Sequence, residues 1–370
     1  MMKVLITGAD GFIAKNLKIH LSERKDIEVL SFTRDNDNAF LIEMVKQADF
    51  IFHLAGINRP KQIDGFKENQ ELTHALCEAL LVCNKKTPIV FTSSTQALLS
   101  NPYGESKSAA EEVLQVFSKR NASPVYIYQL PNVFGKWARP NYNSAVATFC
   151  YNITHDLPIE IHNPHAEISL VYVDDVIREF LNVMDDHHIN HESLIVNPVY
   201  KITVGKLAEQ LYAFRDSRHS LITEPVGKGL IRALYSTYVS YLPPQSFSYT
   251  LPKYEDIRGV FVEILKTTDS GQISYFTAPP GVTRGGHYHH TKTEKFIVIK
   301  GKAQFRFKNI VSDEYYDLYT SGDTPTIVET VPGWSHDITN VGDDEMIVML
   351  WANEIFDRVF PDTYTRPLTT

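Results

Sequence analysis

Four residues of the types that bind transition metals lie in the last quarter of the chain. They are His287, His289, Glu294 and His336. On an extended strand, side chains two residues apart project to the same face, so His287 and His289 can enter one site. Three imidazoles and one carboxylate form a good site for a divalent transition metal, and zinc suits chemistry that needs no redox change. The sequence therefore predicts one metal site, with zinc as the expected ion.

A tyrosine and a lysine in the first third of the chain have the spacing of a proton-transfer pair. Tyr103 and Lys107 are four residues apart, so a helix brings them to one face. The lysine ammonium favours tyrosinate and is expected to lower the pKa of Tyr103 toward the range of a general acid. Ser94, at the end of the preceding apolar run, can hydrogen-bond a carbonyl substrate. Ser94, Tyr103 and Lys107 are therefore the first catalytic candidates.

A glycine turn near the start of the chain is suited to a dinucleotide. Gly8 and Gly11 follow an apolar strand and open an amphipathic helix. Glycines let the backbone approach a pyrophosphate, and the helix N-terminus supplies free N–H groups. At the end of the second strand, Arg34 can pair with the 2′-phosphate of NADP, whereas a carboxylate such as the adjacent Asp35 suits the ribose of NAD. Arg34 favours NADPH as the cofactor.

The apolar pattern changes once along the chain. Up to about Tyr241, short apolar runs alternate with helical patterns, which predicts an α/β Rossmann-type doubly wound parallel sheet. Beyond Pro243-Pro244, short strands are separated by Gly, Pro and Asp turns, which predicts an all-β sandwich or barrel. We expect a first domain over residues 1–245 and a second over residues 246–370.

Bulk composition excludes several classes of protein. The 370 residues are 43% hydrophobic and 22% charged, as in a soluble protein of two domains. A net charge of -8 argues against binding nucleic acid. No run approaches the roughly 20 apolar residues that a membrane span needs, so no membrane association is expected. The three cysteines lack metal or redox spacing, which predicts a reduced, cytoplasmic setting.

The first two thirds of the chain resemble the extended short-chain dehydrogenase/reductase family. The resemblance implies that Tyr103 is the acid, that Lys107 binds the nicotinamide ribose and that Ser94 orients the carbonyl. It also implies that Asn132 and Asn143 bind the sugar nucleotide. Thr95 and Gln96 stand where sugar 4,6-dehydratases of the family carry an acid pair, so dehydration is not expected. The stretches that carry the resemblance are Gly8 to Gly11, His53-Leu54-Ala55-Gly56, Ser94, Tyr103, Lys107, Pro131 to Gly135 and Tyr172 to Val176. The cofactor-binding residues expected in total are Gly8, Gly11, Phe12, Ile13, Arg34, Leu54, Ala55, Gly56, Tyr103 and Lys107.

The rest of the chain resembles the cupin superfamily, which implies an all-β jelly-roll domain. The matching residues are Gly281, His287, His289, Glu294 and Gly301, followed by Pro332 to His336 and Asn340. The stretches 256–261 and 284–288 also resemble the dTDP-4-keto-6-deoxyhexose epimerases, in which the equivalent of His287 is the base. The two resemblances thus assign His287 incompatible roles, metal ligand and catalytic base. The match of Glu294 to the metal motif favours the role of ligand. His290 can replace His289 as a ligand or act as the base, and it is the catalytic candidate of this domain.

Over nearly its full length the chain resembles the CapF-like family of bifunctional capsular-polysaccharide and O-antigen enzymes. The stretches are 102–107, 135–137, 141–144 and 287–292. The resemblance implies C3 epimerisation of a UDP-4-keto-2-acetamido-2,6-dideoxyhexose in the cupin. NADPH-dependent reduction at C4 would follow, giving UDP-2-acetamido-2,6-dideoxy-L-talose on the path to N-acetyl-L-fucosamine.

Two alternatives remain open from the sequence. One is a nucleotide-sugar 4-epimerase that retains NAD. The other is a reductase whose cupin only binds metal, sugar or a partner subunit. A homodimer or a higher homo-oligomer is expected, because the helix that carries the Tyr-Lys pair often packs against its twin in extended short-chain reductases.

Overall fold

The computed structural model describes residues 1–60, 62–186 and 194–368. The chain forms two compact units, of which the first comprises Met1–Tyr212 and Lys228–Pro243. The second comprises Ala213–Gly227 and the chain from Pro244 onward. The domain boundary expected at 245–246 lies beside this division, but residues 213–227 join the second unit. They do so because Ile222 pairs with Lys266 and Arg218 donates a hydrogen bond to the carbonyl of Ser246 at 2.7 Å.

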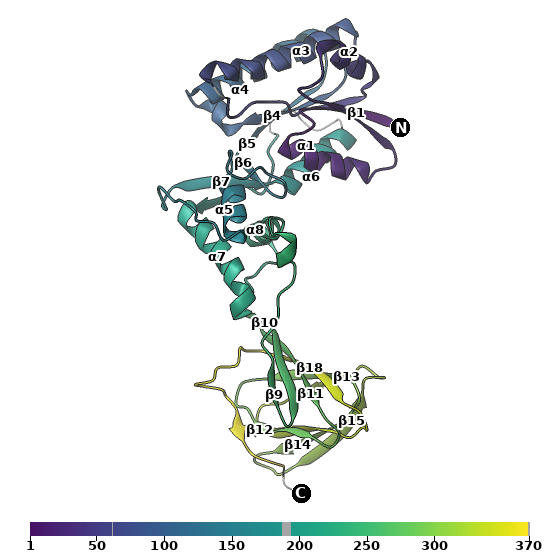
Figure 1. The fold of residues 1–370 in the computed structure, drawn as a ribbon. Helices are drawn as coiled ribbons and strands as arrows, with labels where there is room; N and C mark the ends of the chain where they lie inside the picture. The colour runs from purple at the N-terminus through teal and green to yellow at the C-terminus, as the bar shows by residue number, and fades with distance from the viewer. Residues whose placement is uncertain (61, 187–193, 369–370) are drawn as a thin grey trace. The chain divides into compact units, whose positions relative to one another are not determined.

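The first unit is built on a parallel sheet with the strand order β2-β1-β3-β4-β5. Helices cover both faces, with α2, α3 and α4 on one side and α1 and α6 on the other (Figure 1). Because both faces are covered, the strands are apolar runs, and this confirms the doubly wound sheet that the sequence predicts. The strands are β1 (Met2–Thr7), β2 (Ile27–Phe32), β3 (Phe50–His53), β4 (Ile89–Ser94) and β5 (Val125–Leu130). The helices are α1 (Phe12–Ser22), α2 (Asn38–Gln47), α3 (Glu68–Val82), α4 (Pro102–Asn121) and α6 (Val173–Asp185).

Helix α4 begins earlier than the apolar periodicity alone indicates. The periodic stretch starts at Ser106, but Asn101 caps the helix by accepting a hydrogen bond from the N–H of Gly104 at 2.9 Å. Pro102 occupies the first turn, where its missing N–H costs nothing. Tyr103 and Lys107 therefore stand in the first two turns of α4, just beyond the end of β4.

A small second sheet also belongs to the first unit. Its strands are β6 (Asn132–Phe134), β7 (Glu167–Tyr172) and β8 (Tyr200–Thr203). The first unit also contains the helices α5 (Ala145–Thr154) and α8 (Gly229–Val239) and the 3-10 turns η1 (Ile63–Lys67) and η2 (Thr95–Leu98). Helix α7 (Val204–Ser220) begins in the first unit and ends in the second, and the 3-10 turn η3 (Pro244–Ser246) belongs to the second. In the described part of the chain, no helix combines the length and the apolar character needed to cross a membrane.

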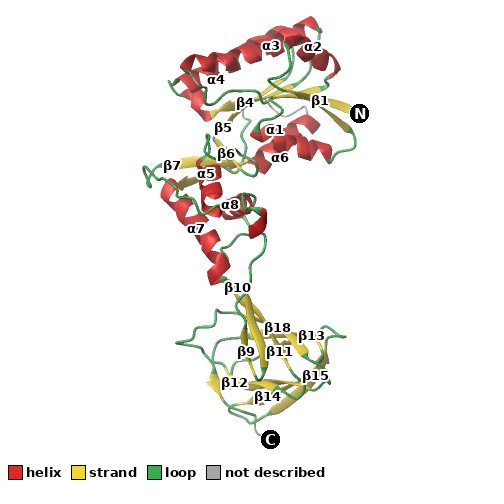
Figure 2. Cartoon of the chain, in the orientation of Figure 1, coloured by secondary structure: helices red, strands yellow, loops and turns green. Residues whose placement is uncertain are grey.

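The second unit consists of two antiparallel sheets that enclose an apolar core (Figure 2). Side chains alternate between the core and the surface along the strands, and Phe276, Phe296, Phe305 and Val348 meet inside. This confirms the predicted all-β jelly roll. The first sheet runs β16 (Ile327–Glu329), β13 (Glu294–Lys300), β18 (Met346–Ala352), β11 (Gly271–Ala278), β10 (Gly259–Thr267) and β9 (Tyr254–Asp256). The second runs β15 (Tyr315–Ser321), β14 (Lys302–Asn309), β17 (Trp334–Asn340), β12 (Thr283–Tyr288) and β19 (Tyr364–Thr365).

Candidate active site and metal centre

The glycine turn after β1 has the geometry of an anion-binding loop. Gly8 has a φ of +67°, and a Cβ there would lie 2.7 Å from the backbone of Ala55, so only glycine lets the two turns approach. Gly11 is the N-cap of α1, and among the described residues no side chain caps the helix and no acidic residue stands in its first turn. The N–H groups at Phe12 and Ile13 therefore belong to a helix end that can receive a pyrophosphate.

The turn after β3 brings the predicted cofactor residues Leu54, Ala55 and Gly56 beside the catalytic helix. A Cβ on Gly56 would lie 3.3 Å from both Nζ of Lys107 and Oδ1 of Asn69. Asn69 also bonds to both backbone groups of Ile57, and its Nδ2 donates to the hydroxyl of Ser106 at 3.0 Å. A buried amide thus links the cofactor turn to α4, and this contact is not evident from sequence spacing.

His53 is a buried connector that the sequence indicated only as part of a family motif. Its Nδ1 lies 2.7 Å from the hydroxyl of Thr7, and its Nε2 lies 3.0 Å from that of Thr73. Burial lowers the pKa of His53 to about 3, and the charge of Lys107 acts in the same direction. The imidazole is therefore neutral and ties β1, β3 and α3 together beneath the cofactor turn.

The structure brings Ser94, Tyr103 and Lys107 together. Ser94 lies close enough to Tyr103 to act on its pKa, and Nζ of Lys107 donates to the carbonyl of Thr92 at 2.8 Å. The expected lowering of the tyrosine pKa is wrong: burial raises the pKa of Tyr103, and the polar contact with Ser94 only opposes this. Tyr103 therefore holds its proton at neutral pH, as a general acid must.

Glu111 is a further polar residue near this group. Its carboxylate accepts hydrogen bonds from Ser93 and, at 3.1 Å to both oxygens, from Nε2 of Gln129. Burial lowers the pKa of Lys107 to about 8, and the negative charge of Glu111 opposes this shift. The four-residue spacing of Lys107 and Glu111 on one helix is the sequence signal for this contact.

The remaining predicted residues of the first unit lie on the surface. Arg34 is exposed two residues beyond Phe32, whose carbonyl accepts a hydrogen bond from Ala9 in the glycine turn. Asn132 begins β6, and its Nδ2 donates to the carbonyl of Ser169 at 3.1 Å. Asn143 is exposed in the loop before α5. Arg34 thus follows a strand that is hydrogen-bonded to the glycine turn after β1. The structure links neither asparagine to Ser94 by a described hydrogen bond.

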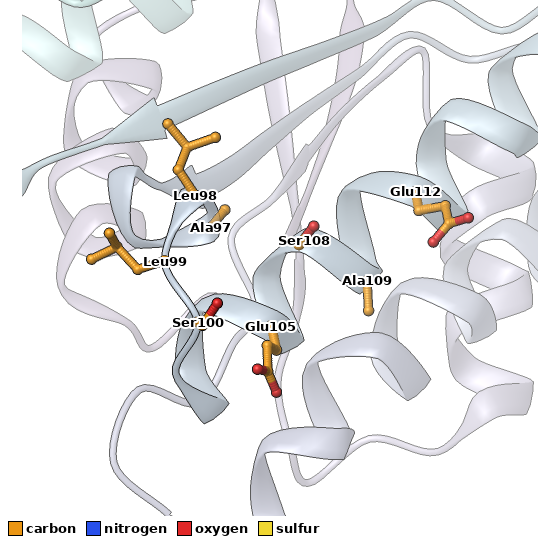
Figure 3. Close-up of a pocket in the computed structure, with 8 residues that line it drawn as sticks. All are labelled: Ala97, Leu98, Leu99, Ser100, Glu105, Ser108, Ala109 and Glu112. Carbon is orange, nitrogen blue, oxygen red and sulfur yellow. The ribbon is translucent and has the colours of Figure 1, made fainter.

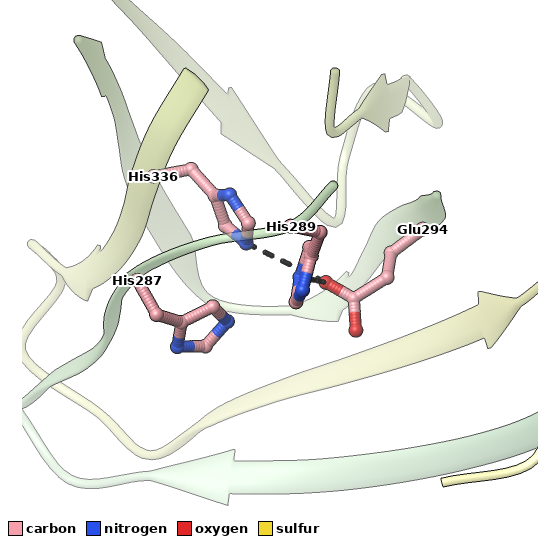
Figure 4. Close-up of side chains that lie close together, drawn as sticks. All are labelled: His287, His289, Glu294 and His336. Carbon is pink, nitrogen blue, oxygen red and sulfur yellow. Dashed lines mark hydrogen bonds and ion pairs between the residues drawn. The ribbon is translucent and has the colours of Figure 1, made fainter. Parts of the chain in front are cut away.

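The four predicted metal ligands converge in the second unit (Figure 4). One ligand atom from each of them lies within 4.8 Å of the others. His287 on β12 pairs directly with His336 on β17, and Glu294 begins β13 in the opposing sheet. Oε2 of Glu294 lies 3.2 Å from Nε2 of His289 and 3.5 Å from Nε2 of His336. The two sheets therefore supply a compact, largely buried ligand set.

The charge states of this cluster suit a divalent cation. Burial, followed by the nearby His336, lowers the pKa of His287 to about 3, so its imidazole is neutral. Burial opposes ionisation of Glu294, but its contacts with His289 and His336 outweigh burial and hold its pKa well below the usual value. Nε2 of His336 is buried without a hydrogen-bond partner in the described chain. The neutral imidazole of His287, the carboxylate of Glu294 and a buried ring nitrogen of His336 that makes no described hydrogen bond fit a metal ion.

His290 stands apart from the ligand cluster. Its ring packs edge-on against Tyr364 and Tyr288, with centroid distances of 4.7 and 5.5 Å. Among the described residues, the metal-binding group contains His289 and not His290. The structure therefore separates the two adjacent histidines, one in the cluster and one on the surface.

Comparisons with known proteins find relatives for both units of the chain. Residues 4–197 match the NAD dependent epimerase/dehydratase family, and residues 254–364 match the polysaccharide biosynthesis C-terminal domain. The chain is 62% identical to a UDP-2-acetamido-2,6-beta-L-arabino-hexul-4-ose reductase of Pseudomonas aeruginosa, over 98% of both chains. The crystal structure of the capsular polysaccharide assembling protein CapF from Staphylococcus aureus superposes with a TM-score of 0.91 at 40% identity, covering 99% of this chain and 100% of that one. The chain belongs to the CapF-like family.

A more distant likeness concerns the fold of the first unit alone. A UDP-glucuronic acid 4-epimerase from Bacillus cereus, solved with NAD, has a TM-score of 0.54 at 17% identity, covering 65% of this CapF-like chain and 98% of that protein. At this identity only the fold is shared. The epimerase/dehydratase family of the first unit nevertheless indicates a nicotinamide cofactor.

Proposed function

We propose that this CapF-like enzyme acts twice on a UDP-4-keto-2-acetamido-2,6-dideoxyhexose. The cupin unit epimerises C3, and the first unit reduces C4 with NADPH to give UDP-2-acetamido-2,6-dideoxy-L-talose. The product would serve N-acetyl-L-fucosamine synthesis for a capsule or O-antigen. The observation that carries the reductase assignment is the 62% identity, over 98% of both chains, to a protein named as a UDP-hexul-4-ose reductase.

The reduction step uses the buried group on β4 and α4. NADPH, when bound, supplies a hydride to the carbonyl carbon. Ser94 would donate a hydrogen bond to the carbonyl oxygen, and Tyr103 would give its proton to that oxygen as negative charge develops there. With a pKa of about 8, Lys107 is a cation at neutral pH and stabilises the tyrosinate that remains. Arg34 would hold the 2′-phosphate.

The epimerisation step uses the metal cluster and its neighbour. The C4 ketone acidifies the proton at C3, and a divalent ion, when bound, stabilises the negative charge that follows its removal. His287, His289, Glu294 and His336 would hold that ion, which we propose is zinc. His290 would remove the proton, because it is exposed and lies outside the ligand set. A proton from solvent, delivered to the opposite face of C3, would complete the inversion.

A reductase with a non-catalytic cupin is the second candidate. The Pseudomonas aeruginosa relative is named for reduction alone. In that case the metal would stabilise the barrel, and epimerisation would be absent. Proton exchange at C3 without NADPH distinguishes the two functions.

We further propose a homodimer that works in the cytoplasm, where nucleotide sugars and NADPH are available. Support for assembly comes from apolar side chains that lie exposed around η2 and α4: Leu98 is 77% exposed, Val116 59% and Leu99 56%. Leu98 and Leu99 border a shallow hollow that α4 lines with Glu105, Ser108, Ala109 and Glu112 (Figure 3). Burial of this surface against a second copy would remove it from water.

The deciding experiment is incubation with a UDP-4-keto-6-deoxy-N-acetylhexosamine in deuterated buffer, with and without NADPH. We expect NADPH oxidation at 340 nm and, by NMR, deuterium at C3 even when NADPH is omitted. Oxidation without C3 exchange would favour the non-catalytic cupin. A tightly held NAD with no net oxidation would instead indicate a 4-epimerase.

A further inference from the structure

Residues 362–366 lie along the outer edge of the strand that carries the first metal ligand. Tyr364 and Thr365 form β19, which pairs antiparallel with β12 so that Thr365 is opposite His287. The N–H of Arg366 donates to the carbonyl of Gly286 at 2.8 Å. The other edge of β12 pairs with β17, which bears His336. Strand β12 is therefore held between a ligand-bearing strand and this segment.

Within the segment, the carboxylate of Asp362 binds the turn that joins the ligands His289 and Glu294. It accepts hydrogen bonds from the backbone N–H of His290 at 2.9 Å and from those of Thr291 and Lys292 at 2.8 Å. The hydroxyl of Thr291 adds a fourth bond at 3.0 Å. The Asp362 carboxylate thus fixes three successive residues of the turn.

The backbone of the same residue contacts a ligand directly. The carbonyl of Asp362 accepts a hydrogen bond from Nδ1 of His289 at 2.6 Å. Because a carbonyl can only accept, Nδ1 of His289 carries a proton, and Nε2 is the ring nitrogen that faces the cluster, 3.2 Å from Oε2 of Glu294. Asp362 has a φ of +36°, a conformation that residues other than glycine rarely adopt. In this conformation, the side chain of Asp362 binds the turn after His289 while its carbonyl binds the ring of His289.

We propose that Asp362 is a positioning residue of the metal centre, setting the ring orientation and the tautomer of His289 and the path of the backbone toward Glu294. The inference rests on the proposed metal site. Asp362 has no side-chain contact with the four ligand side chains among the described hydrogen bonds and ion pairs. Asp362 therefore acts on the ligands without binding the metal itself. Loss of such a hydrogen-bond partner of a ligand typically lowers metal affinity about 10- to 100-fold.

The test is zinc affinity of the full chain, measured by competition with a chelating indicator. Asp362→Ala should weaken zinc binding about 10- to 100-fold, and Asp362→Asn, which keeps one accepting oxygen, should weaken it less. The matched control is Asp357→Ala. Asp357 lies in the loop between β18 and β19, and its carboxylate also accepts hydrogen bonds from two backbone N–H groups, those of Val359 and Phe360. It has no described hydrogen bond to the turn that joins His289 and Glu294. Its zinc affinity should stay within about twofold of wild type, the change expected when no ligand partner is lost.

Thermal melting and nitrogen-15 NMR of the histidines accompany the titration. In wild type, His289 should hold its proton on Nδ1, and Asp362→Ala should mix the tautomers. Wild-type zinc affinity in folded Asp362→Ala overturns the inference, as do equal losses in the Asp357 control. If neither Asp362 variant retains the thermal transition of the barrel, Asp362 is a folding residue and the inference is also overturned. Failure of wild type to bind one zinc ion overturns the metal site itself.

Discussion

Glu111 lies one helical turn beyond Lys107 on α4, and its negative charge raises the pKa of that lysine against the effect of burial. Burial is the larger effect, so the pKa of Lys107 is lowered to about 8 from 10.5. Ser93 and Gln129 donate hydrogen bonds that fix the Glu111 carboxylate between β4 and β5. The lysine is therefore a cation at neutral pH and close to losing its charge in mildly alkaline solution.

The pH dependence of the reduction should reveal the effect of Glu111 on the pKa of Lys107. Because Lys107 acts as a cation, kcat/KM for NADPH oxidation should fall as pH rises through about 8. Glu111→Gln removes the charge that raises the lysine pKa, so this falling limb should move to lower pH. The measurement is a pH profile from 6 to 10 with the keto sugar. Glu112→Gln, at the exposed neighbouring position, is the control and should leave the limb in place. Equal shifts in both variants would exclude a specific role for Glu111.

The proton donor is tested by removing one hydroxyl. Tyr103→Phe should lower NADPH oxidation with the keto sugar by about 10²- to 10⁴-fold, the usual contribution of a general acid. NADPH binding should be nearly unchanged, because only the transferable proton is lost. Stopped-flow rates and fluorescence titration measure the two quantities. Tyr249→Phe, at an exposed residue of the second unit, should have no effect. Substantial turnover by Tyr103→Phe would assign the acid role to another group.

Features that depend on short spacing could be predicted from the sequence, and those that depend on long-range contacts could not. The apolar runs give the strands of both units, and the spacing of Tyr103 and Lys107 places them on one helix. The direction of the Tyr103 pKa was wrong because burial dominates it, and burial is set by the whole fold. The role of Asp362 was missed because it lies 72 residues from the N–H of His290 that it binds.

Cofactor choice should depend on Arg34. Arg34→Asp places a carboxylate where the 2′-phosphate of NADPH is expected, so NADPH should bind about 10- to 100-fold more weakly, as expected for loss of a charge-assisted contact and gain of a repulsion. NADH lacks that phosphate and should bind with little change. Fluorescence titration with both cofactors gives the ratio of the NADPH and NADH affinities. The NADH titration is the control, because NADH lacks the 2′-phosphate. An equal change for the two cofactors would make Arg34 an ordinary surface residue.

Subunit assembly should depend on the apolar surface around η2 and α4. Leu98→Glu combined with Val116→Glu should convert a dimer to a monomer, because two carboxylates would be buried at the interface. Light scattering at several protein concentrations measures the mass. Val311→Glu is the control, since Val311 is exposed on the second unit. A wild-type chain that is monomeric at every concentration would contradict the proposed dimer.

Two variants, each lacking one proposed metal ligand, distinguish a catalytic role of the metal from a structural one. Glu294→Gln removes the only carboxylate of the cluster, and His336→Ala removes the imidazole whose Nε2 is buried without a hydrogen-bond partner in the described chain. Either change should abolish stoichiometric zinc binding and stop deuterium from entering C3. The first unit should stay folded and bind NADPH as before. Glu329→Gln, which alters only a surface ion pair with Lys295, is the matched control and should exchange normally.

The thermal transition of the barrel decides between the two roles. If the metal is structural, Glu294→Gln and His336→Ala should abolish that transition, because binding energy at a structural site contributes to folding. If the metal is catalytic, the transition should persist while exchange is lost, since the charge that stabilises the deprotonated sugar is missing. A folded, metal-free variant that exchanges the C3 hydrogen at the wild-type rate would contradict metal-assisted epimerisation. Proton removal by His290, packed against Tyr288 and Tyr364, would then have to proceed without the metal, and His290 would be the next residue to replace.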